Sequence, residues 1–134
     1  MSDDQNIDGT VRIPVSSIYS FQSVIRRDVF SQIQGPGAPQ KIAITKEHMI
    51  IGRSPDVDIQ MRSNLVSRRH VELSREGSEL ICRDLKNPDT GKYSHNGLLL
   101  NGLRVHSVAL RDGDTIQIGD IVLLFHQGVQ WTSS

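Results

Sequence analysis

Three short stretches of the sequence concentrate polar groups that can bind an anion. They are a Gly-Arg pair at 52–53, a Ser-Arg-Arg-His block at 67–70 and a Ser-His-Asn-Gly block at 94–97. An arginine guanidinium can donate two parallel hydrogen bonds to a phosphate. A serine hydroxyl adds a short donor, and an asparagine amide both donates and accepts. Together these residue types predict a binding site for a compact anionic group.

The positive charge of these stretches is local, because the chain as a whole carries none. Fifteen Lys and Arg residues balance fifteen Asp and Glu residues among 134. Proteins that bind nucleic acid or a membrane surface through charge usually carry a basic excess. No apolar run approaches the roughly 20 residues of a membrane helix. We therefore expect neither a nucleic acid nor a membrane as a partner.

The cysteine content and the first residues indicate a cytoplasmic protein. Cys82 is the single cysteine, so it cannot form an intrachain disulfide, which is usual in a reducing compartment. Residues 1–10 are acidic and polar and lack the basic and apolar regions of a secretory signal. Alternation places Leu80 and Cys82 on one face of a strand, which predicts a buried thiol. We expect no metal and no cofactor.

The chain is predicted to consist of a tail, one domain and a short exit. Residues 1–26 have weak periodicity and are predicted to form a flexible N-terminal tail, and 129–134 a C-terminal exit or linker. Residues 27–128 contain short runs rich in β-branched residues, separated by turn-forming Gly, Pro and Asp. No segment there keeps helical spacing over ten residues. This pattern predicts an all-β domain, and we expect a β-sandwich.

The last third of the domain shows the alternation most clearly. Apolar residues that recur at every second position, before and after a Gly-Asp turn, are expected to face the core; they are Ile116, Ile118, Ile121, Leu123 and Phe125. Asn101-Gly102 between two apolar runs predicts a tight hairpin turn.

The polar blocks, taken in order and with their spacing, resemble the forkhead-associated (FHA) family of phosphothreonine-binding domains. The matching blocks are Gly52-Arg53, Ser67-Arg68-Arg69-His70, Asp84-Leu85, Ser94-His95-Asn96-Gly97 and Asn101-Gly102. The resemblance covers roughly residues 27–128. It implies a sandwich of about eleven mostly antiparallel strands, with loops at one end that bind phosphothreonine peptides.

The resemblance implies five residues that bind the phosphopeptide. Arg53 pairs with the phosphate and Ser67 is a second phosphate ligand. Arg68 turns toward the phosphate or the adjacent peptide backbone. Asn96 binds the peptide backbone, and His95 occupies a position that often holds a threonine of the phosphate site.

The resemblance also implies three residues that support the site. Gly52 precedes the phosphate-binding arginine, His70 braces the loop that holds Ser67, and Gly97 permits a tight turn. Arg69 is expected to point away into solvent. The connection at 86–93 is longer than usual for the family, so we expect an enlarged loop near the binding surface, where Lys86 and Lys92 could add positive charge.

Thr10 is a candidate phosphoacceptor in the N-terminal tail. Acidic residues precede it, and Ile13 lies three positions after it, where family members often read an aliphatic side chain. Sixteen extended residues span about 50 Å, which is enough to reach the loops of a small domain. Phosphorylated Thr10 could therefore bind its own domain or a neighbouring copy, or the tail could be plain linker. Either form of recognition needs an upstream Ser/Thr kinase.

The same residues allow three other functions. Ser67, His70 and Asp84 could form a hydrolase triad, but the sequence lacks a Gly-x-Ser-x-Gly nucleophile elbow, so we expect no enzyme. Nucleic acid could bind to arginines 53, 62, 68 and 69. The zero net charge of the chain and its low aromatic content of 4% argue against this function. A phosphate-independent scaffold is the main alternative. Such domains also form the regulatory heads of larger effectors, for example nucleotide cyclases.

Overall fold

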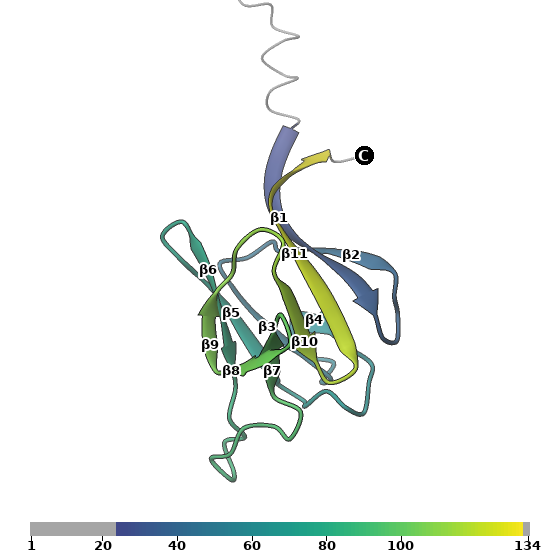
Figure 1. Ribbon diagram of the computed structural model, residues 1–134, viewed down its shortest axis with the longest axis vertical. Helices are drawn as coiled ribbons and strands as arrows, with labels where there is room; N and C mark the ends of the chain where they lie inside the picture. Colours follow the sequence, from purple (N-terminus) through teal and green to yellow (C-terminus); the bar gives the residue numbers. More distant parts are fainter. Residues whose placement is uncertain (1–23, 133–134) are drawn as a thin grey trace, which may run out of the picture. The chain divides into compact units, whose positions relative to one another are not determined.

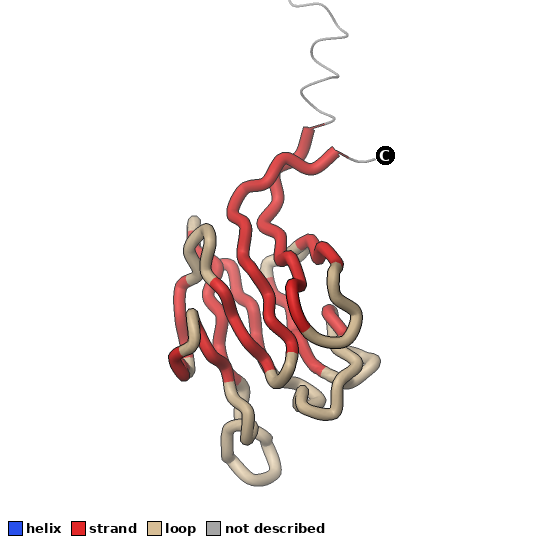
Figure 2. Tube along the Cα trace, turned by 45° about the vertical axis from the view of Figure 1, so that its right-hand side comes forward, coloured by secondary structure: helices blue, strands red, loops and turns tan. Residues whose placement is uncertain are grey.

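The computed structural model describes the backbone of residues 24–132 and the side chains of 26–129. Residues 27–129 form one compact unit. Eleven strands and no helix occur within the described part of the chain. In Figure 2 that part is drawn in red and tan, the colours of strands and loops. No helix there could therefore cross a membrane. Thr10 and the rest of residues 1–23 lie outside the described residues.

The strands form two sheets, which confirms the predicted all-β sandwich of about eleven mostly antiparallel strands (Figure 1). The six-stranded sheet has the order β2 (Gln40–Ala43), β1 (Val24–Gln34), β11 (Ile121–Thr132), β10 (Thr115–Ile118), β7 (Leu98–Leu100) and β8 (Leu103–Val105). The five-stranded sheet has the order β4 (Ile59–Gln60), β3 (His48–Gly52), β5 (Val71–Glu76), β6 (Glu79–Asp84) and β9 (Ser107–Ala109). Among the pairs with a defined register, β3 with β4 is parallel.

Strand boundaries differ from the predicted domain limits in two places. β1 begins at Val24, inside the predicted tail, and β11 continues to Thr132, past the predicted end of the domain. The two strands are neighbours in the sheet, and pairing of this kind satisfies the backbone groups of both. β4 is short, and just before it the Asp58 carboxylate accepts the Ile50 N–H at 2.8 Å and binds Lys46.

The core lies between the two sheets and follows the predicted alternation. The five apolar residues expected on one face, from Ile116 to Phe125, are each at most 1% exposed. Leu80 and Cys82 are buried in the same cluster, at 2% and 0% exposed, and burial raises the pKa of the thiol. Phe30 packs against Phe125 with ring centroids 5.5 Å apart. Burial of this apolar surface is the main favourable term that holds the sheets together.

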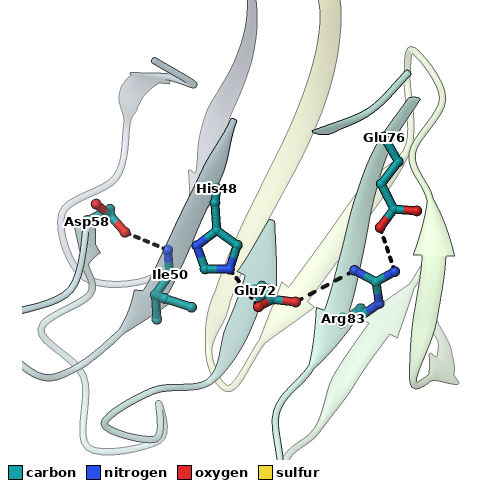
Figure 3. Close-up of polar contacts among 6 residues, drawn as sticks. All are labelled: His48, Ile50, Asp58, Glu72, Glu76 and Arg83. Atoms are coloured by element: carbon teal, nitrogen blue, oxygen red, sulfur yellow. Dashed lines mark hydrogen bonds and ion pairs between the residues drawn. The ribbon is translucent and has the colours of Figure 1, made fainter. Parts of the chain in front are cut away.

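Charged side chains link three strands across the outer face of the five-stranded sheet (Figure 3). His48 on β3 contacts Glu72 on β5 at 2.6 Å, and Glu72 lies 3.6 Å from Arg83 on β6. Arg83 also donates to Glu76 at 2.7 Å. Exposed ion pairs contribute little one by one. As a connected row they tie together the strands whose ends carry the polar blocks.

Sheet topology brings those blocks to one end of the sandwich. β5 is the antiparallel neighbour of both β3 and β6, so the end of β3, the start of β5 and the end of β6 lie together. In the other sheet, the start of β7 pairs with the end of β10. Figure 1 shows the loop that follows β6 extending at the end opposite the β5–β6 turn.

Candidate functional site

Backbone hydrogen bonds hold Arg53 beside the Ser67-Arg68 segment. Beyond the ends of β3 and β5, the Arg53 N–H donates to the Ser67 carbonyl at 2.9 Å, and the Ser54 N–H donates to the Arg68 carbonyl at 3.1 Å. The Nε–H of Arg53 donates to the Val66 carbonyl at 3.0 Å. Two phosphate ligands predicted 14 positions apart are therefore fixed on adjacent extended segments.

Gly52 allows these two segments to approach. A Cβ at position 52 would lie 2.1 Å from the Arg68 carbonyl oxygen and 3.0 Å from the Arg69 Cα. Both atoms belong to the backbone and cannot rotate aside. The glycine that precedes Arg53 is therefore needed for close packing, a requirement independent of backbone dihedral freedom.

His70 joins the Ser67 loop to the turn before β7. Its side chain is fully buried. The Ser67 N–H donates to Nδ1 at 3.0 Å, and Nε2–H donates to the Gly97 carbonyl at 2.7 Å, with the Ser94 hydroxyl 3.0 Å away. A ring that accepts at Nδ1 is neutral. Burial lowers the pKa of His70, which favours this neutral form.

The 94–97 turn is attached to the Ser67 loop a second time. The Asn96 amide donates to the Leu65 carbonyl at 2.9 Å. Gly97 has a φ of +64°, and a Cβ there would lie 2.6 Å from the guanidinium of Arg104. Arg104 in turn donates to the Ser94 carbonyl at 3.0 Å. The tight turn predicted at Gly97 is therefore held by hydrogen bonds to Leu65 on one side and to Arg104 on the other.

A cavity of about 910 Å³ lies at this end of the sandwich. Its walls bring together three of the five predicted binding residues, Arg53, Ser67 and Arg68. His95 and Asn96 do not line it, although both are exposed. Arg69 does line it, although it was expected to point away, because it follows the same extended segment.

The enlarged loop between β6 and β7 forms another wall of the cavity. Residues 85–90 and 92–94 line it. Lys86 and Tyr93 form an isolated bridge that closes the loop, and the Tyr93 ring stacks on His106 with centroids 3.9 Å apart. The sequence predicted an enlarged loop near the site from the extra length of the 86–93 connection. The sequence offered no signal that Tyr93 would stack on His106 and anchor the loop.

Asp84 lies beneath this loop as a buried carboxyl group. Its side chain is fully buried, and neither oxygen has a hydrogen-bond partner among the described residues. Burial raises its pKa, although positive charge on His70, Arg104 and His106 would oppose the shift. His106 Nδ1 is 3.9 Å away. This carboxyl group does not reach the cavity lining.

The hydrogen bonds of the site favour binding over catalysis. Within residues 26–129, the Ser67 hydroxyl and the two terminal nitrogens of Arg53 have no partner and remain available to a ligand. A hydrolase triad would need His70 to accept the Ser67 hydroxyl proton. Instead, Nδ1 accepts the Ser67 backbone N–H and Nε2 donates to Gly97. Asp84 makes no hydrogen bond to the imidazole.

Comparison with known families agrees with this geometry. A family model for the FHA domain matches residues 49–119, more than half of the chain. The chain belongs to the FHA domain family. The match includes every polar block of the site, from Gly52-Arg53 to Asn101-Gly102, so the resemblance stated from the motifs is confirmed.

Two curated FHA relatives are named as regulators. An oxoglutarate dehydrogenase inhibitor from Corynebacterium jeikeium is 36% identical over 95 residues, which are 71% of this chain and 61% of that protein. The glycogen accumulation regulator GarA from Mycolicibacterium smegmatis is also 36% identical over 95 residues, 71% of this chain and 56% of GarA. This chain thus spans less than two thirds of the length of either relative.

A solved FHA structure gives the same result for the fold. A domain described through phosphothreonine-dependent FHA domain interactions superposes with a TM-score of 0.65 at 25% identity. The alignment covers 77% of this chain and 98% of that domain. The phosphothreonine dependence is a property of that neighbour.

Replacing Gly52 by alanine should destabilise the protein. The new methyl group must push β3 away from the 67–70 segment, and overpacking of this kind costs about 1–3 kcal/mol. Urea denaturation would measure the loss. Gly77→Asn is the control, because its Cβ would meet nothing within 4 Å and asparagine tolerates the φ of +64°. Equal stability of the two variants would show that the segments separate freely.

The stability of the protein should fall in mild acid because of His70. Above its ordinary pKa of about 6.5, the imidazole is neutral in both folded and unfolded chains. As the pH falls below that value, the unfolded chain binds a proton that the buried ring excludes. The free energy of unfolding then drops by at most about 1.4 kcal/mol per pH unit.

Urea titrations at several pH values between 7.5 and 5.5 would measure this dependence. His70→Gln is expected to be less stable overall but to have a shallower pH dependence in this range. The other histidines and Asp84 are present in both proteins. Parallel pH curves would mean that His70 takes up its proton in the folded state, contrary to the expectation.

Proposed function

We propose that this chain is a phosphothreonine-dependent protein interaction module that acts in signalling. The observation that carries the proposal is the cavity wall formed by Arg53, Ser67 and Arg68. Their backbones are fixed, while the two terminal nitrogens of Arg53, the Ser67 hydroxyl and the Arg68 guanidinium have no partner among the described residues. A phosphothreonine carries about −1.5 to −2 charges and three acceptor oxygens. A fixed guanidinium and an adjacent hydroxyl match that demand.

Each predicted binding residue has a specific part in this proposal. The terminal nitrogens of Arg53 bind two phosphate oxygens, and the Ser67 hydroxyl binds the third. Arg68 adds charge beside them. Asn96 already uses its NH₂ group on the Leu65 carbonyl, so its side-chain oxygen is the atom left to accept a peptide N–H. His95 is exposed next to it and contacts the peptide outside the cavity.

The proposal is a binding function without catalysis. The occupied nitrogens of His70 leave the Ser67 hydroxyl without a base. The relatives are named an inhibitor and a regulator, which agrees with a module that controls another protein by binding it. The proposal includes a Ser/Thr kinase upstream and a cytoplasmic location. It leaves open that the domain is the regulatory head of a larger effector, such as a nucleotide cyclase.

The N-terminal tail supplies a candidate ligand. Thr10 lies two positions after Asp8 and three before Ile13, and residue 26 is 16 positions further along the chain than Thr10. A ligand on the same chain has a high effective concentration and competes with external partners. We propose that phosphorylated Thr10 binds the Arg53 site of its own domain or of a second copy.

Loss of the Arg53 guanidinium should abolish phosphopeptide binding. Calorimetric titration of a degenerate phosphothreonine library and of a phospho-Thr10 peptide, each beside its unphosphorylated twin, would measure this. We expect micromolar affinity, about −8 kcal/mol, for at least one phosphorylated ligand, and no binding by Arg53→Ala. Arg111→Ala is the matched control, since Arg111 is exposed in the β9–β10 loop and does not line the cavity.

Three results would contradict the proposal. Binding of a partner that persists without the phosphate and with Arg53→Ala would favour the phosphate-independent scaffold. Equal loss in the Arg53 and Arg111 variants would point to general electrostatics, and steeply salt-dependent binding of generic DNA would support a nucleic-acid function.

The tail hypothesis has its own test. After kinase treatment, the wild-type protein should bind an external phosphothreonine peptide more weakly than before, because the phosphorylated tail competes for the site. Thr10→Ala should keep its full affinity under the same treatment. Equal affinities of the treated wild-type and Thr10→Ala proteins would remove self-recognition while leaving the binding module intact.

A further inference from the structure

The cavity contains more positive charge than one phosphate can neutralise. Five cationic side chains line it, Arg53, Arg68, Arg69, Lys86 and Lys92, against the single carboxylate of Asp89. The excess is four positive charges, five minus one, in a chain whose net charge is zero. A phosphothreonine supplies at most about two negative charges. About two positive charges would then remain without a counterion from a singly phosphorylated neutral peptide.

The cations differ in how far other groups already engage them. Arg69 lies 3.7 Å from Asp56, which is outside the cavity lining. Lys86 lies over the Tyr93 ring, 5.1 Å from its centroid, a contact that leaves its charge unneutralised. The side chain of Lys92 forms no hydrogen bond or ion pair with another described residue. The unneutralised charge of the cavity therefore includes both lysines of the β6–β7 loop.

Hydrogen bonds within the loop fix the backbone that carries these lysines. The Asn87 N–H donates to the Lys92 carbonyl at 2.7 Å, and the Gly91 N–H donates back to the Asn87 carbonyl at 2.7 Å. The Asn87 side chain accepts the Asp89 N–H at 2.8 Å. A preformed loop pays less conformational entropy when it binds. The loop that presents both lysines is therefore a preformed part of the cavity wall.

A peptide fits this charge better than an extended polyanion does. The excess is confined to one hollow, and the rest of the chain has 14 acidic residues against 10 basic ones. A nucleic acid or an anionic membrane would need a continuous basic surface. A short segment can instead place one further negative group a few residues from the phosphothreonine.

We propose that the site selects phosphothreonine peptides that carry a second negative charge, bound by Lys86 and Lys92. This inference rests on the proposed function and specifies its ligand class. The second group is a carboxylate of Asp or Glu or another phosphate, because both offer anionic oxygens to an ammonium group. Arg53 and Ser67 recognise the first phosphate, and the loop lysines choose among phosphopeptides.

A degenerate phosphothreonine library would test the selection. Wild-type protein should enrich acidic residues or a second phosphorylated residue on one side of the phosphothreonine. The Lys86→Gln and Lys92→Gln variants should lose that enrichment while still requiring the phosphate. Lys41→Gln is the matched control, because Lys41 is an exposed lysine on β2 that does not line the cavity.

A double-mutant cycle would then locate the contact. For the best enriched peptide, replacing its acidic residue by alanine should weaken binding about three- to ten-fold to the wild-type protein and leave binding to the double Lys86→Gln, Lys92→Gln protein nearly unchanged. The difference should shrink as salt concentration rises. A Lys92→Glu protein should prefer the same peptide with its acidic residue replaced by lysine.

The outcomes separate this inference from the function on which it rests. Phosphate-dependent binding without acidic enrichment, or enrichment that survives the lysine substitutions, overturns the second-charge inference and leaves the binding module in place. Lysine-dependent binding of generic DNA or of anionic vesicles in place of peptides also overturns it. Absence of phosphate-dependent binding in the whole library overturns the inference together with the proposed function.

Discussion

The hydrogen bonds of one buried imidazole join the two sheets at the binding end of the molecule. His70 lies in the loop before β5. Its ring accepts the Ser67 N–H and donates to the carbonyl of Gly97, which precedes β7 in the opposite sheet. The side chain therefore connects two sheets whose strands do not pair with each other. Arg53, Ser67 and the 94–97 turn keep their relative positions because this ring is neutral, buried and bonded at both nitrogens.

The sequence predicted the sandwich and much of the site because both follow local rules. Alternation identified core residues such as Ile116 and Leu123, and Asn101-Gly102 forms the expected two-residue turn between β7 and β8, with φ of 48° and 88°. The Gly-Arg and Ser-x-x-His blocks meet because antiparallel pairing of β3 and β5 continues past the strand ends. These features depend on neighbours in sequence or in the ladder.

Features set by distant contacts could not be predicted in the same way. Asn96 bonds to Leu65, 31 residues earlier, which removes its amide from the cavity. Residues 103–109 form β8 in one sheet and β9 in the other, and His106 lies between the two strands. The His106 carbonyl accepts the Asp84 N–H, and its ring stacks on Tyr93. No local sequence pattern predicts either contact, because each depends on packing between segments that are distant in the sequence.

The closed β6–β7 loop is structurally separate from the segments that carry Arg53 and Ser67. One part of the cavity wall can therefore vary while the other stays constant. The Lys86–Tyr93 bridge makes residues 87–92 a self-contained excursion, whose backbone bonds are made within the loop and not to the Arg53 and Ser67 segments. Substitutions inside it can therefore accumulate without disturbing the backbone hydrogen bonds between the Arg53 and Ser67 segments. Over evolutionary time, a gene duplicate of this domain could change this one hairpin while it inherits the Arg53, Ser67 and Arg68 wall of the cavity unchanged.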